Sequence, residues 1–131
     1  MSKYLEFSDA CLKDRRLLLA ALTALGYADV EEGEALALNG YQGDVRPETA
    51  EIVIRRRHIG SASNDLGFKR TAAGYVPLVS EFDQHTLHAG QFLVKLRTAY
   101  SEQVVEEVRR RLRGTARRTV GENVVKIRVR Y

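Results

Sequence analysis

Three residues with metal-binding side chains lie close together in the sequence: Asp83, His85 and His88. Carboxylates and neutral imidazoles are common ligands of zinc and iron. Their D-x-H-x-x-H spacing matches no strong metal motif, however, and a fourth ligand is not evident. The competing interpretation is that Asp83 caps a helix and that both histidines lie exposed in a loop. We therefore expect no metal or other cofactor, and a metal-dependent enzyme is the weakest of the alternatives.

The other residues that could do chemistry lack the neighbours that catalysis needs. His58 is a possible general base, but no nucleophile is placed beside it. Ser61 and Ser63 do not lie in the G-x-S-x-G context of a nucleophile elbow. Cys11 lies in a helical pattern near apolar residues, which predicts a buried thiol. The phosphate-binding patterns G-x-x-x-x-G-K-[ST] and G-x-G-x-x-G are also missing from the sequence. We therefore predict that the protein is not an enzyme.

Positive charge is concentrated toward the end of the chain. Residues 1–86 hold 10 basic and 13 acidic residues, whereas residues 87–131 hold 11 basic and 4 acidic residues, and the chain as a whole carries +4. From Arg109 to Tyr131 there are nine Lys or Arg residues and one acidic residue, Glu122. A polarised charge of this kind favours association with acidic partners.

Part of this charge could be neutralised within the chain. On a helix, Glu106 would face Arg110 and Glu107 would face Arg111 at a spacing of four residues. The acidic segment 31–34 could meet some of the others in the folded protein. The basic residues without a close sequence partner are Arg109, Arg113, Arg117, Arg118, Lys126, Arg128 and Arg130.

The chain has the size and composition of one globular domain spanning residues 1–131. It is 44% apolar and 29% charged, which excludes a disordered protein, and its single cysteine excludes an internal disulfide. The first residues lack the apolar run of a signal peptide, and no stretch approaches a transmembrane length. We expect a cytoplasmic protein without a membrane partner.

Two amphipathic helices are predicted, at roughly residues 9–26 and 88–113. Ser8 and Asp9 are the candidate N-caps of the first, and Gly26 should end it. The second should end near Gly114. Apolar residues recur along both at steps of three and four.

Short segments with alternating apolar residues predict strands between and after the helices. Pro77 should place its strand at an edge or a bulge, because proline cannot donate a ladder hydrogen bond. The stretch 60–65 is expected to be a mobile polar loop. The predicted strands are 4–7, 35–38, 50–55, 66–70, 75–79 and 124–131, with 117–120 as a further candidate.

This order predicts an α+β fold in which both helices pack on one face of a mostly antiparallel sheet, in a ferredoxin-like or related split arrangement. The residues expected in the core are Leu22, Leu25, Ile52, Ile54, Leu96, Val104, Val108 and Ile127.

The other face of the sheet should then lie open. Strand alternation places Val53, Arg55 and Arg57 on that face, together with Lys126, Arg128 and Arg130 from the last strand. An uncovered face with an exposed valine and several arginines would suit docking to an acidic surface. These residues, with Arg113 and Arg117, are the predicted partner-binding set.

Four short motifs, in this order, give the chain a family resemblance over nearly its whole length. They are the segments 24–27 (ALGY), 40–43 (GYQG) with 49–54 (TAEIVI), 65–68 (DLGF) with 74–80 (GYVPLVS), and 125–131 (VKIRVRY). Together they resemble the hypothetical chloroplast reading frame thirty-five family, a small domain of unknown function in plastids and bacteria. The resemblance implies no activity, cofactor or catalytic residues. Its members occur near AAA-type ATPases in genomes, which offers one class of partner.

The leading hypothesis is a non-catalytic interaction module that acts in a protein complex. Its partner would be an acidic protein surface, on a second copy of the chain or on an AAA-type ATPase. The alternative is nucleic-acid binding through the Arg-rich end of the chain, since phosphates require Lys and Arg on one surface. Against the alternative, the strand around residues 51–57 has no aromatic residues on which bases could stack.

Overall fold

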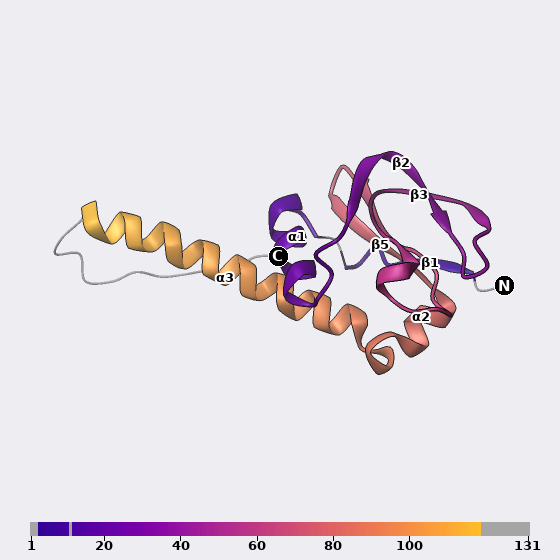
Figure 1. Ribbon diagram of the computed structural model, residues 1–131. Helices are drawn as coiled ribbons and strands as arrows, with labels where there is room; N and C mark the ends of the chain where they lie inside the picture. The colour runs from indigo at the N-terminus through magenta and orange to yellow at the C-terminus, as the bar shows by residue number, and fades with distance from the viewer. Residues whose placement is uncertain (1–2, 11, 119–131) are drawn as a thin grey trace.

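The computed structural model describes residues 3–10 and 12–118, with residues 114–118 described by their backbone alone. The described chain forms one antiparallel sheet with helices along it (Figure 1). In chain order the elements are β1 (Tyr4–Glu6), α1 (Arg15–Ala24), β2 (Glu31–Asn39), β3 (Val45–Ile54), the 3₁₀ turn η1 (Arg56–His58), β4 (Leu66–Thr71), β5 (Gly74–Ser80), α2 (Glu81–Thr86), the 3₁₀ turn η2 (Leu87–Gly90) and α3 (Phe92–Arg118).

The strands lie in the order β1-β5-β4-β3-β2, and each neighbouring pair is antiparallel. Strands β2 to β5 follow one another as a meander, whereas β1 pairs with β5 at the far edge. The two strands that α1 connects, β1 and β2, are therefore separated by three others. A ferredoxin-like sheet inserts one strand between such a pair. The α+β class and the antiparallel sheet are confirmed, and the topology is a related split arrangement.

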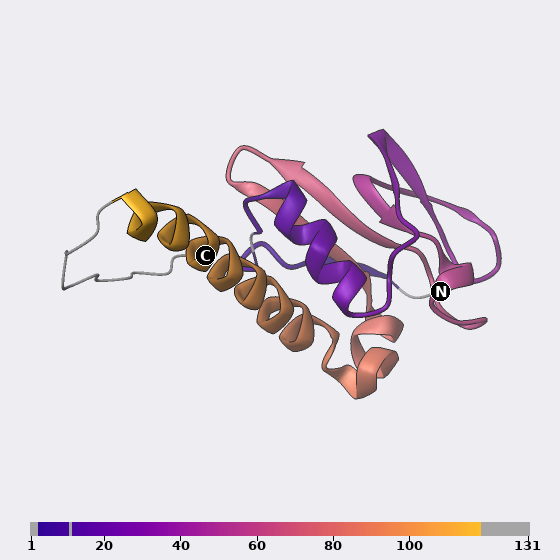
Figure 2. The same ribbon diagram turned by 60° about the vertical axis from the view of Figure 1, so that its left-hand side comes forward.

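Helices α1 and α3 lie side by side over one face of the sheet (Figure 2). Leu18 and Leu22 of α1, Phe68 of β4 and Leu96 of α3 are completely buried between the layers, with Ile54 of β3. The predicted core residues Leu22, Ile52, Ile54 and Leu96 are thus confirmed. Leu25, Val104 and Val108 are only partly buried, and Ile127 lies outside the described residues.

Helix α1 begins later than predicted. Its N-cap is Asp14, whose carboxylate accepts a hydrogen bond from the amide of Leu17 at 3.2 Å. The delay has a structural reason: Leu12 first exchanges two backbone hydrogen bonds with Tyr75 of β5, which keeps the chain extended. The predicted end is confirmed, because Gly26 adopts a left-handed φ of 99° there.

The second predicted helix is interrupted near its start. His88 and Ala89 have left-handed φ angles of 51° and 54°. The turn η2 therefore contains non-helical backbone, and it separates α2 from α3. A short helix that the sequence analysis missed, α2, precedes this turn. Its N-cap is Ser80, and the Ser-x-x-Asp pattern that ends at Asp83 is a helix-start signal.

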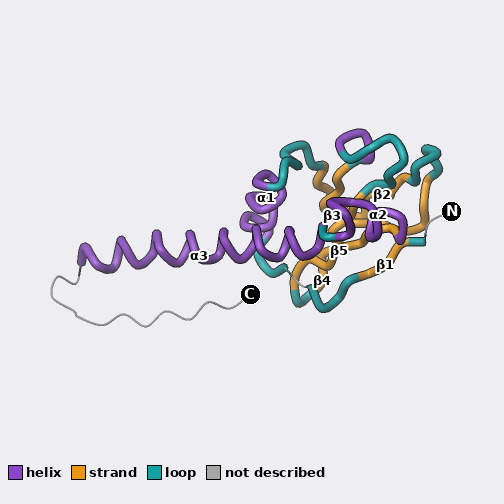
Figure 3. The backbone as a smooth tube through the Cα atoms, turned by 90° about the horizontal axis from the view of Figure 1, so that it is seen from below, coloured by secondary structure: helices purple, strands orange, loops and turns teal. Residues whose placement is uncertain are grey.

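Helix α3 continues through Gly114 to Arg118, so Arg117 lies in a helix and not in a strand. The half of α3 that follows its contact with α1 extends away from the rest of the molecule (Figure 3). Within the described part of the chain, none of the helices combines the length and the apolar character needed to cross a bilayer. The predicted strand 124–131 lies outside the described residues.

Pro77 does not mark an edge strand, because β5 pairs with both β1 and β4. The carbonyl of Pro77 accepts a hydrogen bond from the amide of Phe7, just beyond the last residue of β1. The missing proline donor therefore faces Phe7, where β1 leaves the sheet, and the carbonyl of Phe7 accepts from the amide of Ala10 instead.

The second face of the sheet is closed by the sheet itself. Val53, predicted to be exposed, is completely buried in a second cluster that also holds Ala50 of β3. The cluster includes Tyr4 and Leu38, which come from the two edge strands, so the sheet curls until its edges approach each other. Two irregularities in the β2–β3 register accompany this curl. The expectation of an open face with nothing to cover it is wrong.

Both cores can be tested by truncation. Leu22→Ala or Ile54→Ala should lower the free energy of unfolding by about 2–5 kcal/mol, because each leaves a cavity among buried side chains. Val53→Ala should cost about 2 kcal/mol if the second face is packed as described. Val94→Ala is the matched control, because Val94 is 58% exposed. Urea unfolding followed by circular dichroism measures all four, and a Val53→Ala as mild as Val94→Ala would contradict the curled sheet.

Candidate functional site

The loop between η1 and β4 is a buried polar junction. Ser63, Asn64 and Asp65 are all buried, so the expectation of a mobile polar loop is wrong for these three residues. The amide of Asn64 donates to Asp83 at 3.0 Å, and its side-chain amide donates to the hydroxyl of Ser80 at 2.9 Å. The loop is thereby fixed to the start of α2. Its polarity reflects internal hydrogen bonding and not exposure to water.

Asp65 is the centre of this junction. One oxygen of its carboxylate accepts from the backbone amide of Arg56 at 2.7 Å, and the other accepts from the amide of Asn39 and from Arg55, both at 2.8 Å. The hydroxyl of Tyr4 donates to the backbone carbonyl of Asp65 at 2.6 Å. Burial, followed by the charge of Asp65, raises the pKa of Tyr4, so this hydroxyl stays protonated.

Arg55 belongs to the same junction and is not free to bind a partner. Besides Asp65 it contacts Glu31, with its Nε 2.6 Å from the carboxylate, and the carbonyl of Ala37 at 2.8 Å. Its side chain is only 17% exposed. Replacing Arg55 by glutamate would place a second carboxylate beside the buried Asp65, so this substitution would damage the fold as well as any docking.

The three candidate metal ligands do not form a metal site. No group of three or more His, Cys, Asp or Glu side chains within the described ranges could hold an ion. Asp83 is completely buried and accepts from the hydroxyl of Ser80 at 2.7 Å, whereas His85 is exposed. His88 lies within hydrogen-bonding distance of Tyr27 instead. Asp83 lies in the first turn of α2, near the position that the helix-cap interpretation gave it, but the N-cap residue is Ser80.

His88 forms a compact aromatic contact at the root of α3. Its Nε2 lies 2.8 Å from the hydroxyl of Tyr27, and its ring stacks on Phe92 with the centroids 6.0 Å apart. Burial, with a smaller effect of Lys95, lowers the pKa of His88, and burial followed by Asp83 raises the pKa of Tyr27. Both shifts favour a neutral imidazole that accepts a hydrogen bond from a protonated tyrosine. The sequence analysis did not identify Tyr27; its position just after the helix-ending Gly26 was the available signal.

Arg57 differs from the two arginines before it. Arg56 donates to the carbonyls of Ser61 and Ser63, at 2.7 and 3.0 Å, and so closes the loop on itself. Arg57 is exposed; its one side-chain hydrogen bond within the described structure runs from Nε to His58 at 3.2 Å. Arg57 and His58 lie between two open cavities of about 310 and 430 Å³. Of the two partner-binding arginines predicted on β3 and described by the structure, Arg55 and Arg57, it is Arg57 that is accessible.

Two of the remaining predicted arginines, Arg113 and Arg117, lie on the extended half of α3. Arg113 is 67% exposed and lies 3.9 Å from Glu106, which also approaches Arg109 at 4.0 Å. The expectation that these two arginines have no close sequence partner is therefore wrong. Glu107 lies within 3.5 Å of Arg110 and of Arg111, so the expected Glu107–Arg111 pair forms, whereas Arg110 pairs with Glu107 in place of Glu106. The side chain of Arg117 is not described, and Lys126, Arg128 and Arg130 lie outside the described residues.

Among the described side chains, Glu31 and Glu32 pair with arginines other than Arg109 and Arg113. Glu31 pairs with Arg55, and Glu32 lies 2.5 Å from Arg15 at the start of α1. The hydrogen bond from Arg55 lowers the pKa of Glu31. The structure thus brings Arg55 together with Asp65, leaves Arg57 beside two cavities and places Arg113 on a separate surface, so these three arginines do not form one site.

The Ser80 hydroxyl should be important for stability. It donates to Asp83 and accepts from the amide of Asp83 and from the side chain of Asn64, so alanine would leave buried groups without partners. Ser80→Ala should lower the free energy of unfolding by roughly 1–3 kcal/mol. Ser61→Ala, at an exposed serine of the same loop, should change it little. Urea denaturation of both variants measures the difference, and equal stabilities would contradict the junction.

The contact of His88 with Tyr27 predicts a loss of stability in mild acid. Because the pKa of His88 is lowered in the folded state, the unfolded chain takes up a proton first as the pH falls through about 6.5. The melting temperature should therefore fall between pH 7 and pH 5, above the range in which Glu31 and Glu107 titrate. His88→Gln should reduce this dependence, whereas His85→Gln, at an exposed position, should retain it. Identical pH profiles for both variants would refute the assignment.

Comparisons with known proteins identify a family but no activity. No curated protein and no solved structure gives a significant match to the chain. Residues 21–123 match the model of the family described as protein of unknown function (DUF1257). This match begins within α1 and covers β2 to α3. It includes the polar junction, the exposed Arg57 and the exposed arginines of α3. The chain therefore belongs to this family of small domains of unknown function.

Proposed function

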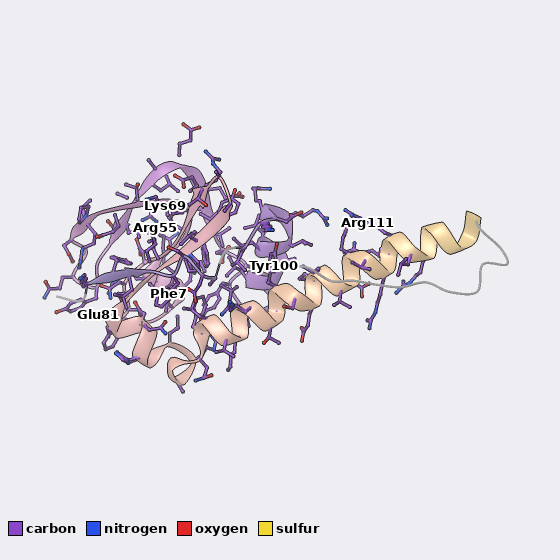
Figure 4. The ribbon with its side chains drawn as sticks, turned by 180° about the vertical axis from the view of Figure 1, so that it is seen from behind. Phe7, Arg55, Lys69, Glu81, Tyr100 and Arg111 are labelled. Atoms are coloured by element: carbon purple, nitrogen blue, oxygen red, sulfur yellow. The ribbon has the colours of Figure 1, made fainter. Side chains whose placement is uncertain are left out.

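We propose that the protein is a non-catalytic interaction module that docks onto an acidic protein surface through the extended half of α3. The observation that carries the proposal is the position of the arginines. Arg109, Arg110, Arg111 and Arg113 are all exposed, and they lie on the part of α3 that extends beyond the body of the protein (Figure 4).

The ion pairs within α3 do not compete strongly with a partner. Glu106 and Glu107 supply two carboxylates for four guanidinium groups, so positive charge remains in excess on this surface. Pairs between exposed side chains contribute little to stability and are screened by salt. A carboxylate on a partner could replace them and gain a bidentate contact with the planar guanidinium group.

The residues considered for chemistry support a non-catalytic role. Asp83 is completely buried under hydrogen bonds to Ser80 and Asn64, and His88 is held by Tyr27 and Phe92. Each therefore has a structural task that keeps the loop or the root of α3 in place. A second copy of the chain is one candidate partner. The resemblance to the chloroplast reading frame thirty-five family adds AAA-type ATPases as another.

Nucleic-acid binding in the cytoplasm is the second candidate function, and the same observation favours it. Phosphates would contact the same arginines, and the affinity would then fall steeply with salt because counterions are released. A protein partner with a few carboxylates should show a weaker dependence on salt. The two candidates are therefore distinguished by the ligand and by the salt slope.

Charge reversal on α3 tests the docking surface. The double variant Arg109→Glu/Arg113→Glu should weaken association with the acidic partner by at least about tenfold, since buried charge pairs at an interface carry much of its specificity. The readout is the yield of co-purified protein from native extract, quantified by mass spectrometry, followed by titration of the purified partner. Circular dichroism should show an intact fold, because both side chains are exposed.

Lys3→Glu/Lys69→Glu is the matched control, with the same change in charge at two exposed positions, one just before β1 and one on β4. Equal loss of the partner in both double variants would attribute the effect to net charge and overturn the proposed surface. Nucleic acid that co-purifies with the wild type, shown by its absorbance at 260 nm and lost in the α3 variant alone, would favour the second candidate.

A further inference from the structure

We infer that the groove beside Arg57 and His58 is a binding site for small molecules that carry a phosphate group. This site is separate from the docking surface on α3 and does not depend on it. Both residues follow β3 in the 3₁₀ turn η1. Both residues line each of two adjoining cavities, so basic side chains border a hollow at this place.

The larger cavity has the chemistry of an anion site. It measures about 430 Å³ and is lined by Arg56, Arg57, His58, Ile59, Gly60 and Ser61. None of these residues is acidic, and they offer the exposed guanidinium group of Arg57, an imidazole and a hydroxyl. Arginine pairs with phosphate oxygens through parallel hydrogen bonds, and the serine hydroxyl can donate a further one. The volume falls in the range of small-molecule sites, so it would hold a phosphate group with a small organic substituent.

The walls of this cavity are fixed before any ligand binds. Arg56 donates to the carbonyls of Ser61 and Ser63, and its own amide is held by the buried Asp65. Asn64, next in the chain, is bound to Asp83. The segment that presents Arg57 and Ser61 is therefore pinned at both ends, so little conformational entropy is lost when an anion is bound.

Arg57 is the residue with free binding capacity. Its Nε donates to His58, which leaves both terminal nitrogens without a hydrogen bond to any described residue. Arg55, by contrast, is saturated by Glu31, Asp65 and Ala37. A guanidinium group held at its Nε and open at its other two nitrogens is oriented to bind an oxyanion in a forked geometry.

The smaller cavity restricts the ligand. It measures about 310 Å³ and includes Asp29 and Glu31 on its wall, across Arg57 and His58 from the basic side. Arg55 and Arg57 also line this cavity, but the two carboxylates offset their charge, so the phosphate group should favour the larger cavity, which has no acidic residue. The organic part of the ligand would then extend toward Val30 and Ile59, the apolar residues that border the two cavities.

Titration of the full chain with phenyl phosphate at low salt, followed by ¹H–¹⁵N spectra, tests the site. Saturable shifts should be confined to the amides of residues 56–61, with a dissociation constant of about 1 mM or lower, a modest affinity for a small ligand. Inorganic phosphate should compete, and phenol should give no shifts. Shifts that do not saturate, or that are larger on the arginines of α3, would overturn the inference.

Arg57→Gln should weaken the binding of phenyl phosphate by about tenfold or more, because a charge-assisted contact is lost. Ser61→Ala should weaken it to a smaller extent. Lys69→Gln, at an exposed lysine of β4, is the matched control and should leave the affinity unchanged. Since all three side chains are exposed, the variants should fold like the wild type. Equal affinities for Arg57→Gln and Lys69→Gln would show that the anion responds to net charge only.

Discussion

The buried carboxylate of Asp65 connects parts of the chain that the sheet alone would not hold together. It accepts hydrogen bonds from the amide of Asn39 at the end of β2, and from Arg55 and the amide of Arg56 just after β3. The Tyr4 hydroxyl of β1 binds its backbone carbonyl. A buried charge is strongly destabilising unless it is paired and hydrogen-bonded. The three donors to the carboxylate offset the cost of burying it, and together with the Tyr4 hydroxyl they hold both edge strands close to the loop before β4.

The exposed surfaces of the protein follow from this constraint. Because the edges of the sheet approach each other, Val53 is buried and Arg55 becomes an internal residue. The same carboxylate fixes Arg56, whose side chain shapes the loop up to Ser63, so that Arg57 is the first arginine of the run to face solvent. In the curled sheet, Arg55 and Arg56 make internal hydrogen bonds, whereas Arg57 remains accessible to a ligand. Any docking surface must then lie elsewhere, and α3 provides one.

Local periodicity was sufficient to predict the layers of this fold but not the curl of the sheet. The spacing of Leu18 and Leu22, and the alternation that ends at Ile54, correctly identified the faces that α1 and β3 bury together. Alternation also placed Val53 on the opposite face, but whether that face is covered depends on contacts between β1 and β2, which are distant in sequence. The polar segment 63–65 was misassigned for a related reason. Composition indicates hydrogen-bonding capacity, and only the folded structure shows that its partners are internal.

The direction of α3 is set by the contacts of its first turns with the body of the protein. Its first turns are fixed to the body by Phe92 and Leu96, both buried, and by the hydroxyl of Tyr100, which accepts from the amide of Asp14 at 3.0 Å. Farther along, Arg16 of α1 lies 3.2 Å from Glu107, near the point where the two helices part. The exposed arginines begin two residues later. A helix anchored over its first half holds its second half in a fixed direction, so a partner would not have to order it on binding. The left-handed residues before Phe92 set that direction, which makes the contact between Tyr27 and His88 relevant to docking although it lies far from the arginines.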